Sequence, residues 1–181
     1  MASTLTVDNI VGRATSTDVH IPGHVIQTVN AEKTDTVSSS STAPTFTDTG
    51  LSCTITPKFS NSKILVHVNA GLGISTAVFN MMRVVRNIGG GTFSIISEAD
   101  AAGSRPAAHA GVYDGGNQGH LVMQDFIHLD SPATTSAVIY KVQLASSGGG
   151  TIYLNRSTRD NNGSAYDPRV SSRIVLQEIA Q

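Results

Sequence analysis

Tryptophan is absent from this chain, cysteine occurs once, and only 14% of the residues are charged. A single cysteine can form neither a disulfide within the chain nor a thiolate metal site of its own. Cys53 has Leu51 and Ile55 as near neighbours, which predicts a buried and unreactive thiol. The formal net charge of −1 provides no broad basic surface for nucleic acid. No apolar run of about 18 residues occurs, so insertion into a membrane is not expected.

Residues that favour helices are also scarce, with four Lys and three Glu in the whole chain. Serine, threonine and glycine dominate instead, with 21, 19 and 17 copies. Apolar and polar residues alternate along short runs such as 64–69 and 138–144, and this period of two favours strands. Turn sequences such as Gly89-Gly90-Gly91 and Asn162-Gly163 end these runs. The pattern predicts an all-β fold, an antiparallel β-sandwich of the jelly-roll kind.

The individual strands follow from the same alternation. Strands are expected at residues 24–30, 44–48, 51–56, 63–70, 78–87, 92–97, 119–129, 136–145, 151–155 and 172–179. Residues 32–42 and 156–172 are polar and are expected to be loops. Residues 99–110 contain Gly103 and Pro106, which interrupt a helix, so a long loop is expected there as well.

Two of the expected strands carry apolar residues on both faces. Residues 78–88 include Met81, Met82, Val84 and Val85, and the last strand includes Ile174, Val175, Leu176 and Ile179. A sandwich strand normally exposes one face to water, so a strand of this kind needs a second cover. We expect a neighbouring subunit to supply it. The alternative is a strand that lies beneath a loop of its own chain.

The first 22 residues differ in character from the rest. They lack a basic start followed by an apolar block of roughly 7–15 residues, so no secretory signal is expected. They are too short and too rich in Thr, Asp and Gly to form a core. We predict an attachment arm at residues 1–22 and a β-sandwich knob domain at residues 23–181. The attachment contacts are expected from Leu5, Val7, Asn9 and Ile10.

The sequence offers no arrangement suited to catalysis or to metal binding. Asp125 lies within an apolar strand, where it is either a buried acid or, as we prefer, a hydrogen-bonded structural residue. Glu178 is expected to pair with an arginine such as Arg173 or Arg83. The remaining Asp residues, Asp130 among them, are expected mostly in turns. We therefore expect no enzyme activity, no metal and no cofactor.

Binding is the chemistry that the sequence favours. Polar side chains can bond sugar hydroxyls while an aromatic face covers the apolar side of the ring. Two loops combine such groups: Arg105, His109, Tyr113, Asp114 and Asn117 in the first, and Arg159, Asn161, Asn162, Tyr166 and Asp167 in the second. The alternative is that both are ordinary solvated turns. The lack of tryptophan argues against a high-affinity sugar site.

Several blocks of the sequence, taken in order, resemble a known group of proteins. Thr4-Leu5-Thr6-Val7-Asp8-Asn9-Ile10 and Val19-His20-Ile21-Pro22-Gly23-His24-Val25-Ile26-Gln27 form the opening blocks, and residues 62–66, 129–137, 140–143, 153–157 and 171–179 form the later ones. Together they resemble small virion proteins of marine bacteriophages, of the tail-fibre or structural kind. The resemblance implies a jelly-roll-like homotrimer that the arm joins to another virion protein. It transfers no catalytic or binding residue.

The expected function follows from the composition and from this resemblance. We expect a phage virion structural protein of tail-fibre or fibre-knob type, made in the host cytoplasm and located in the virion. It would attach the particle to the host surface, with a surface glycan as a candidate receptor, through many weak contacts. One alternative is a capsid decoration or head-fibre protein. A less favoured alternative is a secreted carbohydrate-binding module.

Overall fold

The structure is a computed structural model of the chain, and it describes residues 5–11, 21–75, 78–100, 102–113, 115, 118–163 and 165–181. These residues form strands and connections without any helix. The described residues therefore include no helix long and apolar enough to cross a bilayer. The strands are β1 (Val25–Lys33), β2 (Val37–Ser39), β3 (Thr47–Ile55), β4 (Lys63–Ile74), β5 (Phe79–Ile88), β6 (Ser94–Ile95), β7 (Ala110–Tyr113), β8 (Leu121–Asp130), β9 (Val138–Ser146), β10 (Ile152–Leu154) and β11 (Ser172–Ile179).

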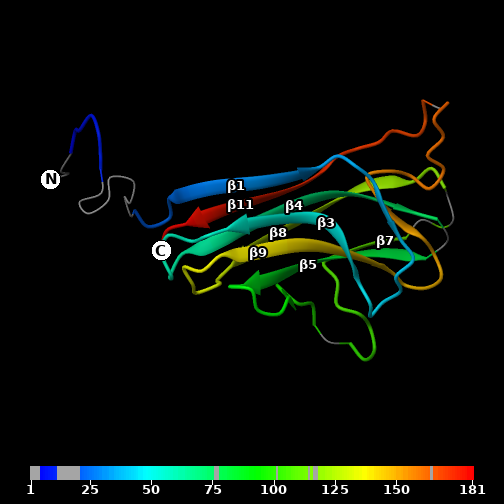
Figure 1. Cartoon of the computed structure of the whole chain (residues 1–181), viewed down its shortest axis with the longest axis horizontal. Helices are drawn as coiled ribbons and strands as arrows, with labels where there is room; N and C mark the ends of the chain where they lie inside the picture. The colour runs from blue at the N-terminus through cyan, green and yellow to red at the C-terminus, as the bar shows by residue number, and fades with distance from the viewer. Residues whose placement is uncertain are drawn as a thin grey trace.

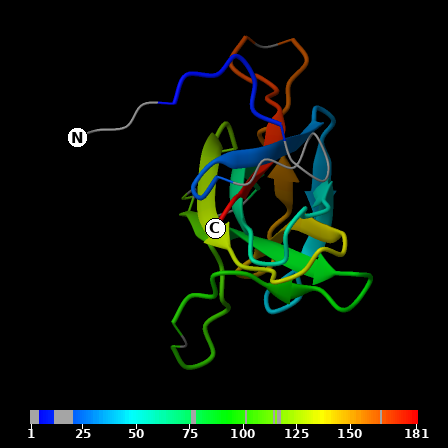
Figure 2. The ribbon, with the colours of Figure 1, turned by 90° about the vertical axis from the view of Figure 1, so that its left-hand side faces the viewer.

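The strands form two antiparallel sheets that face each other (Figure 1, Figure 2). In the first, sheet A, β8 pairs with one edge of β4, while β11 and the short β10 share the other edge. β1 pairs with β11 and β2 with β10. In the second, sheet B, the order is β3, β9, β5, and then β6 and β7 on the far edge of β5.

Without the two- and three-residue strands β2, β6 and β10, the orders are β1-β11-β4-β8 and β3-β9-β5-β7. Two four-stranded sheets that exchange strands in this order form a jelly roll, with its two Greek keys. The predicted fold class, an all-β sandwich of the jelly-roll kind, is therefore confirmed. The pairing that closes each sheet joins residues far apart in the sequence, such as Val29 with Leu176 and Thr47 with Leu144.

The core lies between the sheets and is built from alternate residues of each long strand. On β4, Ile64, Val66 and Val68 are fully buried, whereas His67 between them is exposed. This is the period of two that the sequence shows. Cys53 on β3 is buried in the same core, and burial raises the pKa of its thiol. The predicted burial of this thiol is confirmed.

Several strand boundaries differ from the prediction. The expected strand at 44–48 does not form as such, because β3 begins at Thr47 and continues to Ile55 with a register shift between Asp48 and Ser52. Gly50, with a φ of 79°, lies within that shift and gives the backbone the freedom it needs. The predicted loop at 32–42 contains β2, and β7 was not predicted. Both are three- or four-residue strands, too short to show a period.

Buried polar contacts correct two expectations. Asp130, expected in a turn, is the last residue of β8, and it accepts hydrogen bonds of 2.7 Å from Arg86 and from the Tyr140 hydroxyl. Burial, followed by the charge of Asp130, raises the pKa of Tyr140. The second correction concerns Glu178. Asp125, by contrast, is exposed on the outer face of β8 and accepts a hydrogen bond from Asn69, in agreement with the preferred alternative of a hydrogen-bonded residue.

Glu178 is fully buried, yet its partners are not arginines. One carboxylate oxygen accepts the N–H groups of Lys58 and Phe59 at 2.8 and 3.2 Å, and the other accepts the Gln27 side-chain amide at 2.6 Å. The arginine that was expected to pair with it, Arg173, bonds Glu32 instead, while Arg83 bonds Gln143. Glu178 thus ties the connection between β3 and β4 to Gln27 of β1, the edge strand of sheet A.

The two ends of the sandwich differ in what they carry. At one end, which we call the arm end, the Gly23 N–H donates to the Ala180 carbonyl at 2.8 Å, and β11 ends beside the start of β1. Residues 5–11 lie beyond this end (Figure 1), and Leu5, Val7, Asn9 and Ile10 are all exposed. The connection 155–171 lies at the opposite end, which we call the distal end. The boundary of the arm at residue 22 stays a prediction.

Candidate functional site

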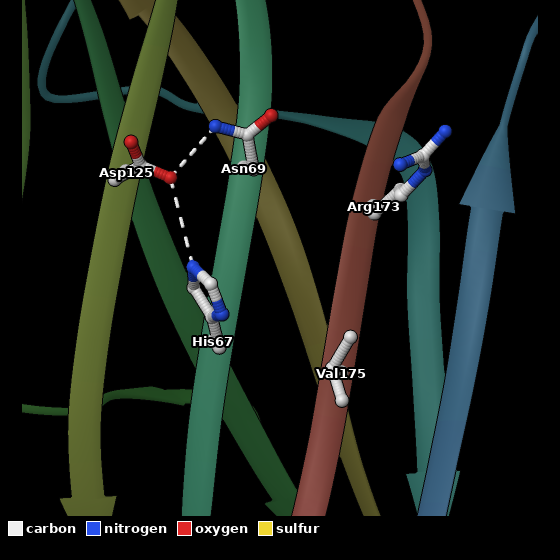
Figure 3. A pocket seen from close by; sticks show the side chains of 5 residues that line it. All are labelled: His67, Asn69, Asp125, Arg173 and Val175. Carbon is white, nitrogen blue, oxygen red and sulfur yellow. Dashed lines mark hydrogen bonds and ion pairs between the residues drawn. The ribbon is translucent and has the colours of Figure 1, made fainter.

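The outer face of sheet A carries a polar row that crosses four strands. Asp125 of β8 pairs in register with Asn69 of β4, which pairs with Arg173 of β11, which pairs with Glu32 of β1. The Asn69 amide donates to Asp125 at 2.7 Å, and His67 lies 3.6 Å from the same carboxylate (Figure 3). A shallow hollow of about 340 Å³ lies over these residues.

Apolar side chains adjoin this polar row. Ile127 is 64% exposed, Leu129 is 44% exposed and Met123 is 38% exposed, all on the outer face of β8. Val175 of β11 lines the same hollow as the polar row (Figure 3). The outer face of sheet A therefore mixes exposed apolar and charged groups.

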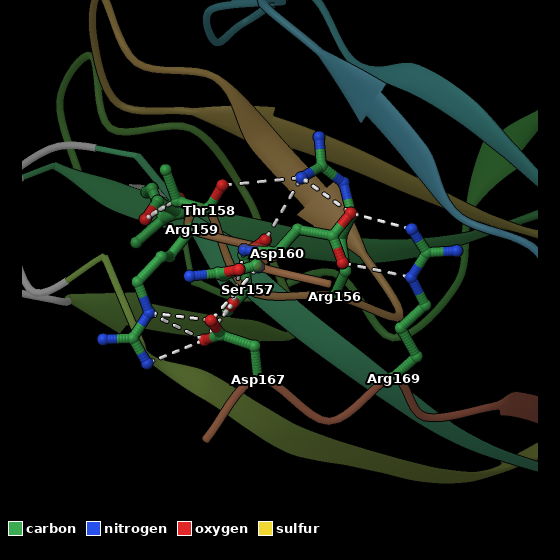
Figure 4. A network of polar contacts seen from close by, with 9 residues as sticks. Arg156, Ser157, Thr158, Arg159, Asp160, Asp167 and Arg169 are labelled. Atoms are coloured by element: carbon green, nitrogen blue, oxygen red, sulfur yellow. Dashed lines mark hydrogen bonds and ion pairs between the residues drawn. The ribbon is translucent and has the colours of Figure 1, made fainter. Parts of the chain in front are cut away.

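The second predicted binding loop is held together by ion pairs (Figure 4). Arg159 donates through two nitrogens to Asp167 at 2.8 Å, and Asp167 also accepts the Asn161 N–H at 3.1 Å. The hydrogen bond from Arg159 is the main reason that the pKa of Asp167 falls to about 2. Asp160 accepts Arg169 at 2.8 Å. Opposite charges in this loop therefore neutralise each other over the physiological pH range.

This loop is also fixed to the sandwich. Asn155, buried and with a φ of 66°, donates to the carbonyls of Lys33 and Asp35 and accepts the Ser172 hydroxyl at 2.6 Å. At Gly73 of β4, a Cβ would lie 2.2 Å from the Arg156 carbonyl oxygen. The strand thus has a glycine where the loop backbone approaches it.

Among the predicted residues of this loop, the structure separates two groups. Arg159, Asn161 and Asp167 bond one another, so they shape the loop. Asn162 and Tyr166 are exposed, Tyr166 to 82%. The loop also contacts the connection before β8, because the Arg159 N–H donates to the Gln118 carbonyl at 3.0 Å.

The first predicted loop is only partly assembled as expected. Asp114 and Asn117 lie outside the described residues. His109 bridges the gap between β6 and β7 on the edge of β5: its Nδ1 accepts the Val84 N–H at 2.9 Å, and its Nε2 donates to the Ile96 carbonyl at 2.5 Å. Its ring stacks on Phe126 of sheet A with centroids 4.2 Å apart. Both ring nitrogens are occupied by backbone groups, so His109 is not available to a ligand in this arrangement.

The pKa of His109 is lowered, mainly because the imidazole ring is buried away from water. A second proton would have to be placed on Nδ1, which already accepts a hydrogen bond. The neutral ring therefore completes the hydrogen bonding of the β5 edge, a position normally filled by a backbone strand. In sequence, His109 is indistinguishable from a surface histidine, because its partners Val84 and Ile96 are remote from it.

The remaining residues of this loop border an open apolar hollow of about 570 Å³. Arg105 lines it, and Tyr113 lies beside it in contact with Phe79. The rings of Phe79 and Tyr113 are 49% and 54% exposed, with centroids 5.2 Å apart and planes inclined by 45°. The hollow is also lined by Phe79, Met81 and Ser147, which residue type alone did not predict. An outward phenylalanine at the start of a strand was the available signal.

In the part of the chain that the structure describes, no group of three or more His, Cys, Asp or Glu side chains is placed to hold a metal ion. The arrangement instead offers an exposed aromatic pair, a guanidinium group and a preformed hollow, which are the elements of a binding site.

Comparisons with known proteins add a likeness of fold. No protein-family model and no curated protein matches the chain. A structure of infectious bursal disease virus, Gx strain, is similar to the whole chain with a TM-score of 0.41 and 12% identity. The crystal structure of the infectious bursal disease virus VP2 subviral particle gives a TM-score of 0.37 and 11% identity. The chain spans 43% of each of these viral chains, and at such TM-scores the likeness assigns no function.

Proposed function

We propose that the protein is a structural component of a bacteriophage virion, of tail-fibre type, that attaches the particle to the host surface. The observation that supports the proposal is that the predicted arm and the 155–171 loop lie at opposite ends of the sandwich. The predicted arm joins at one end, where Gly23 bonds Ala180, and the ordered 155–171 loop occupies the other (Figure 1). The sequence blocks that resemble phage virion proteins support the same assignment.

Copies of the chain would associate through the outer face of sheet A. The apolar side chains Ile127 and Leu129 are exposed there, and covering them removes apolar surface from water. Three copies, as the resemblance implies, would present three distal ends in one direction. Weak contacts that act together can raise avidity by about 10²–10⁴ over a single contact. No single site then needs high affinity.

The test compares the full chain with a variant that lacks residues 1–22. Both are supplied during infection, and purified particles are probed for the protein. The full chain is expected in particles and the truncated chain is not, although circular dichroism should show that the truncated chain folds. Added in excess, the purified full chain should slow adsorption of particles to host cells.

Incorporation of the truncated chain would overturn the role of the arm. Unchanged adsorption in the presence of excess full chain would overturn the role in attachment. Imaging of particles with a labelled copy separates a tail position from a head position, and a head position would favour capsid decoration instead.

A further inference from the structure

The aromatic hollow at the edge of sheet B suggests which chemical class the distal end binds. We infer that the hollow beside Phe79 and Tyr113 is a binding site for an acidic saccharide, a pyranose ring that carries a carboxylate. The inference deepens the proposed function and rests on it for its biological meaning. The site itself is argued from the geometry of the hollow.

The first observation is the exposed aromatic pair. Phe79 of β5 and Tyr113 of β7 are direct cross-strand partners, so their backbones hold the two rings at a fixed spacing. About half of each side chain faces solvent. Because aromatic rings have a large apolar area and few rotamers, such a pair binds a flat apolar surface at little entropic cost. A pyranose ring presents such a surface through its axial C–H groups.

The backbone around Phe79 makes this platform rigid. The Phe79 N–H donates to the Ser147 hydroxyl at 3.0 Å, and the Ser147 N–H donates to the Phe79 carbonyl at 2.9 Å. Ser147 therefore keeps its own hydroxyl proton for another acceptor. Gly111 lies beneath the Phe79 ring, where a Cβ would lie 3.8 Å from the ring edge. The absence of a side chain at Gly111 keeps the floor of the hollow open.

The second observation is the charge at the rim. Arg105 lines the hollow and is exposed. Within the described part of the chain, no carboxylate lies at ion-pair distance from Arg105, unlike the arginines of the 155–171 loop. A guanidinium group binds a carboxylate with two parallel hydrogen bonds. The hollow therefore combines a face for the ring with a cation for an acidic substituent.

The size of the hollow agrees with this occupant. A volume of about 570 Å³ lies within the range of small-molecule sites, and the hollow is open on one side, as an internal unit of a longer chain requires. The apolar lining of Met81, Pro106 and Ala108 suits a ring face better than a fully hydroxylated edge. A neutral saccharide would form no ion pair with Arg105, whereas a carboxylate can, so acidic chains are favoured.

The test titrates the full chain with two probes, a hyaluronan tetrasaccharide, which carries glucuronate, and cellotetraose, which is neutral. Binding is followed by chemical shifts of backbone amides and aromatic protons. The acidic probe is expected to bind more tightly and to shift resonances of Phe79 and Tyr113. Tyr113→Ala should weaken its binding by about tenfold, whereas Tyr113→Phe, which keeps the ring, should change it little. Arg105→Gln should abolish the preference for the acidic probe.

Tyr166→Ala is the matched control, because Tyr166 is an exposed tyrosine of the other loop. Loss of binding in this variant, with Tyr113→Ala unchanged, would overturn the inference. So would the absence of saturable shifts with either probe. If particles carry the protein and excess chain blocks adsorption while neither probe binds, the proposed function stands and the saccharide site fails. If the acidic probe binds but particles lack the protein, the site stands and the proposed function fails.

Discussion

The outer faces of the two sheets carry apolar residues in similar patterns but differ in what covers them. On β5 of sheet B, the outward residues Met81 and Val85 are only 8% and 3% exposed. On β8 of sheet A, the outward residues Ile127 and Leu129 are 64% and 44% exposed. A strand with two apolar faces therefore signals that a cover exists, but it does not say which chain provides it.

Side chains of the same molecule provide the cover on sheet B. Phe93, from the turn between β5 and β6, lies 4.2 Å from the Lys141 ammonium, and Lys141 is the cross-strand partner of Val85. Further along the face, the Arg83 guanidinium lies 4.0 Å over the Phe46 ring. We expected a neighbouring subunit to cover residues 78–88. The structure instead supports the alternative, in which this strand lies beneath other parts of its own chain.

The largest effect on stability is expected when substitutions on the buried and the exposed face of β8 are compared. Asp130→Ala removes the partner of Arg86 and of the Tyr140 hydroxyl, and leaves both in a largely buried place. We expect the free energy of unfolding to fall by about 3–5 kcal/mol, measured by denaturant titration. Asp125→Ala, on the exposed face of the same strand, should cost less than about 1 kcal/mol. Equal losses in the two variants would contradict the distinction between the faces.

A second pair of variants compares the covered and the exposed outer face. Val85→Asp places a charge at a position that is only 3% exposed and should lower the free energy of unfolding by about 3 kcal/mol. Ile127→Asp should give a folded chain with an unchanged circular dichroism spectrum. Its molar mass by light scattering should equal that of a single 18.9 kDa chain, whereas the unmodified protein should have a larger molar mass. If the unmodified protein is a monomer, the proposed association through sheet A is wrong.

The smallest effect is expected from pH, at the edge of sheet B that His109 completes. Burial lowers the pKa of His109 in the folded state, so the unfolded chain takes up that proton more readily. Its contribution to stability is complete above the ordinary histidine pKa of about 6.5 and is lost progressively below it. The melting temperature should therefore decrease between pH 7 and pH 5. His109→Gln should reduce this dependence, and an unchanged dependence would assign it to other groups.

Particular residues show how far the sequence could predict the site. Tyr113 and Arg105 were identified because their residue types suit binding, and the structure sets both at the hollow. Phe79 was missed, because its outward direction depends on the register between β5 and β7. His109 was included, although its ring nitrogens bond the backbone of two other segments. Such partners lie outside any local pattern, so residue type alone cannot reveal them.

The sequence by itself determined the fold class, because alternation with a period of two and frequent turn residues leave few alternatives to an antiparallel sandwich. It also determined that Cys53 is buried, since burial follows from the same alternation. Only the tertiary structure decided which charges are buried, as at Asp130 and Glu178, and which apolar face stays open. These outcomes depend on contacts between strands that are distant in the chain, and the strand order of the jelly roll sets those contacts.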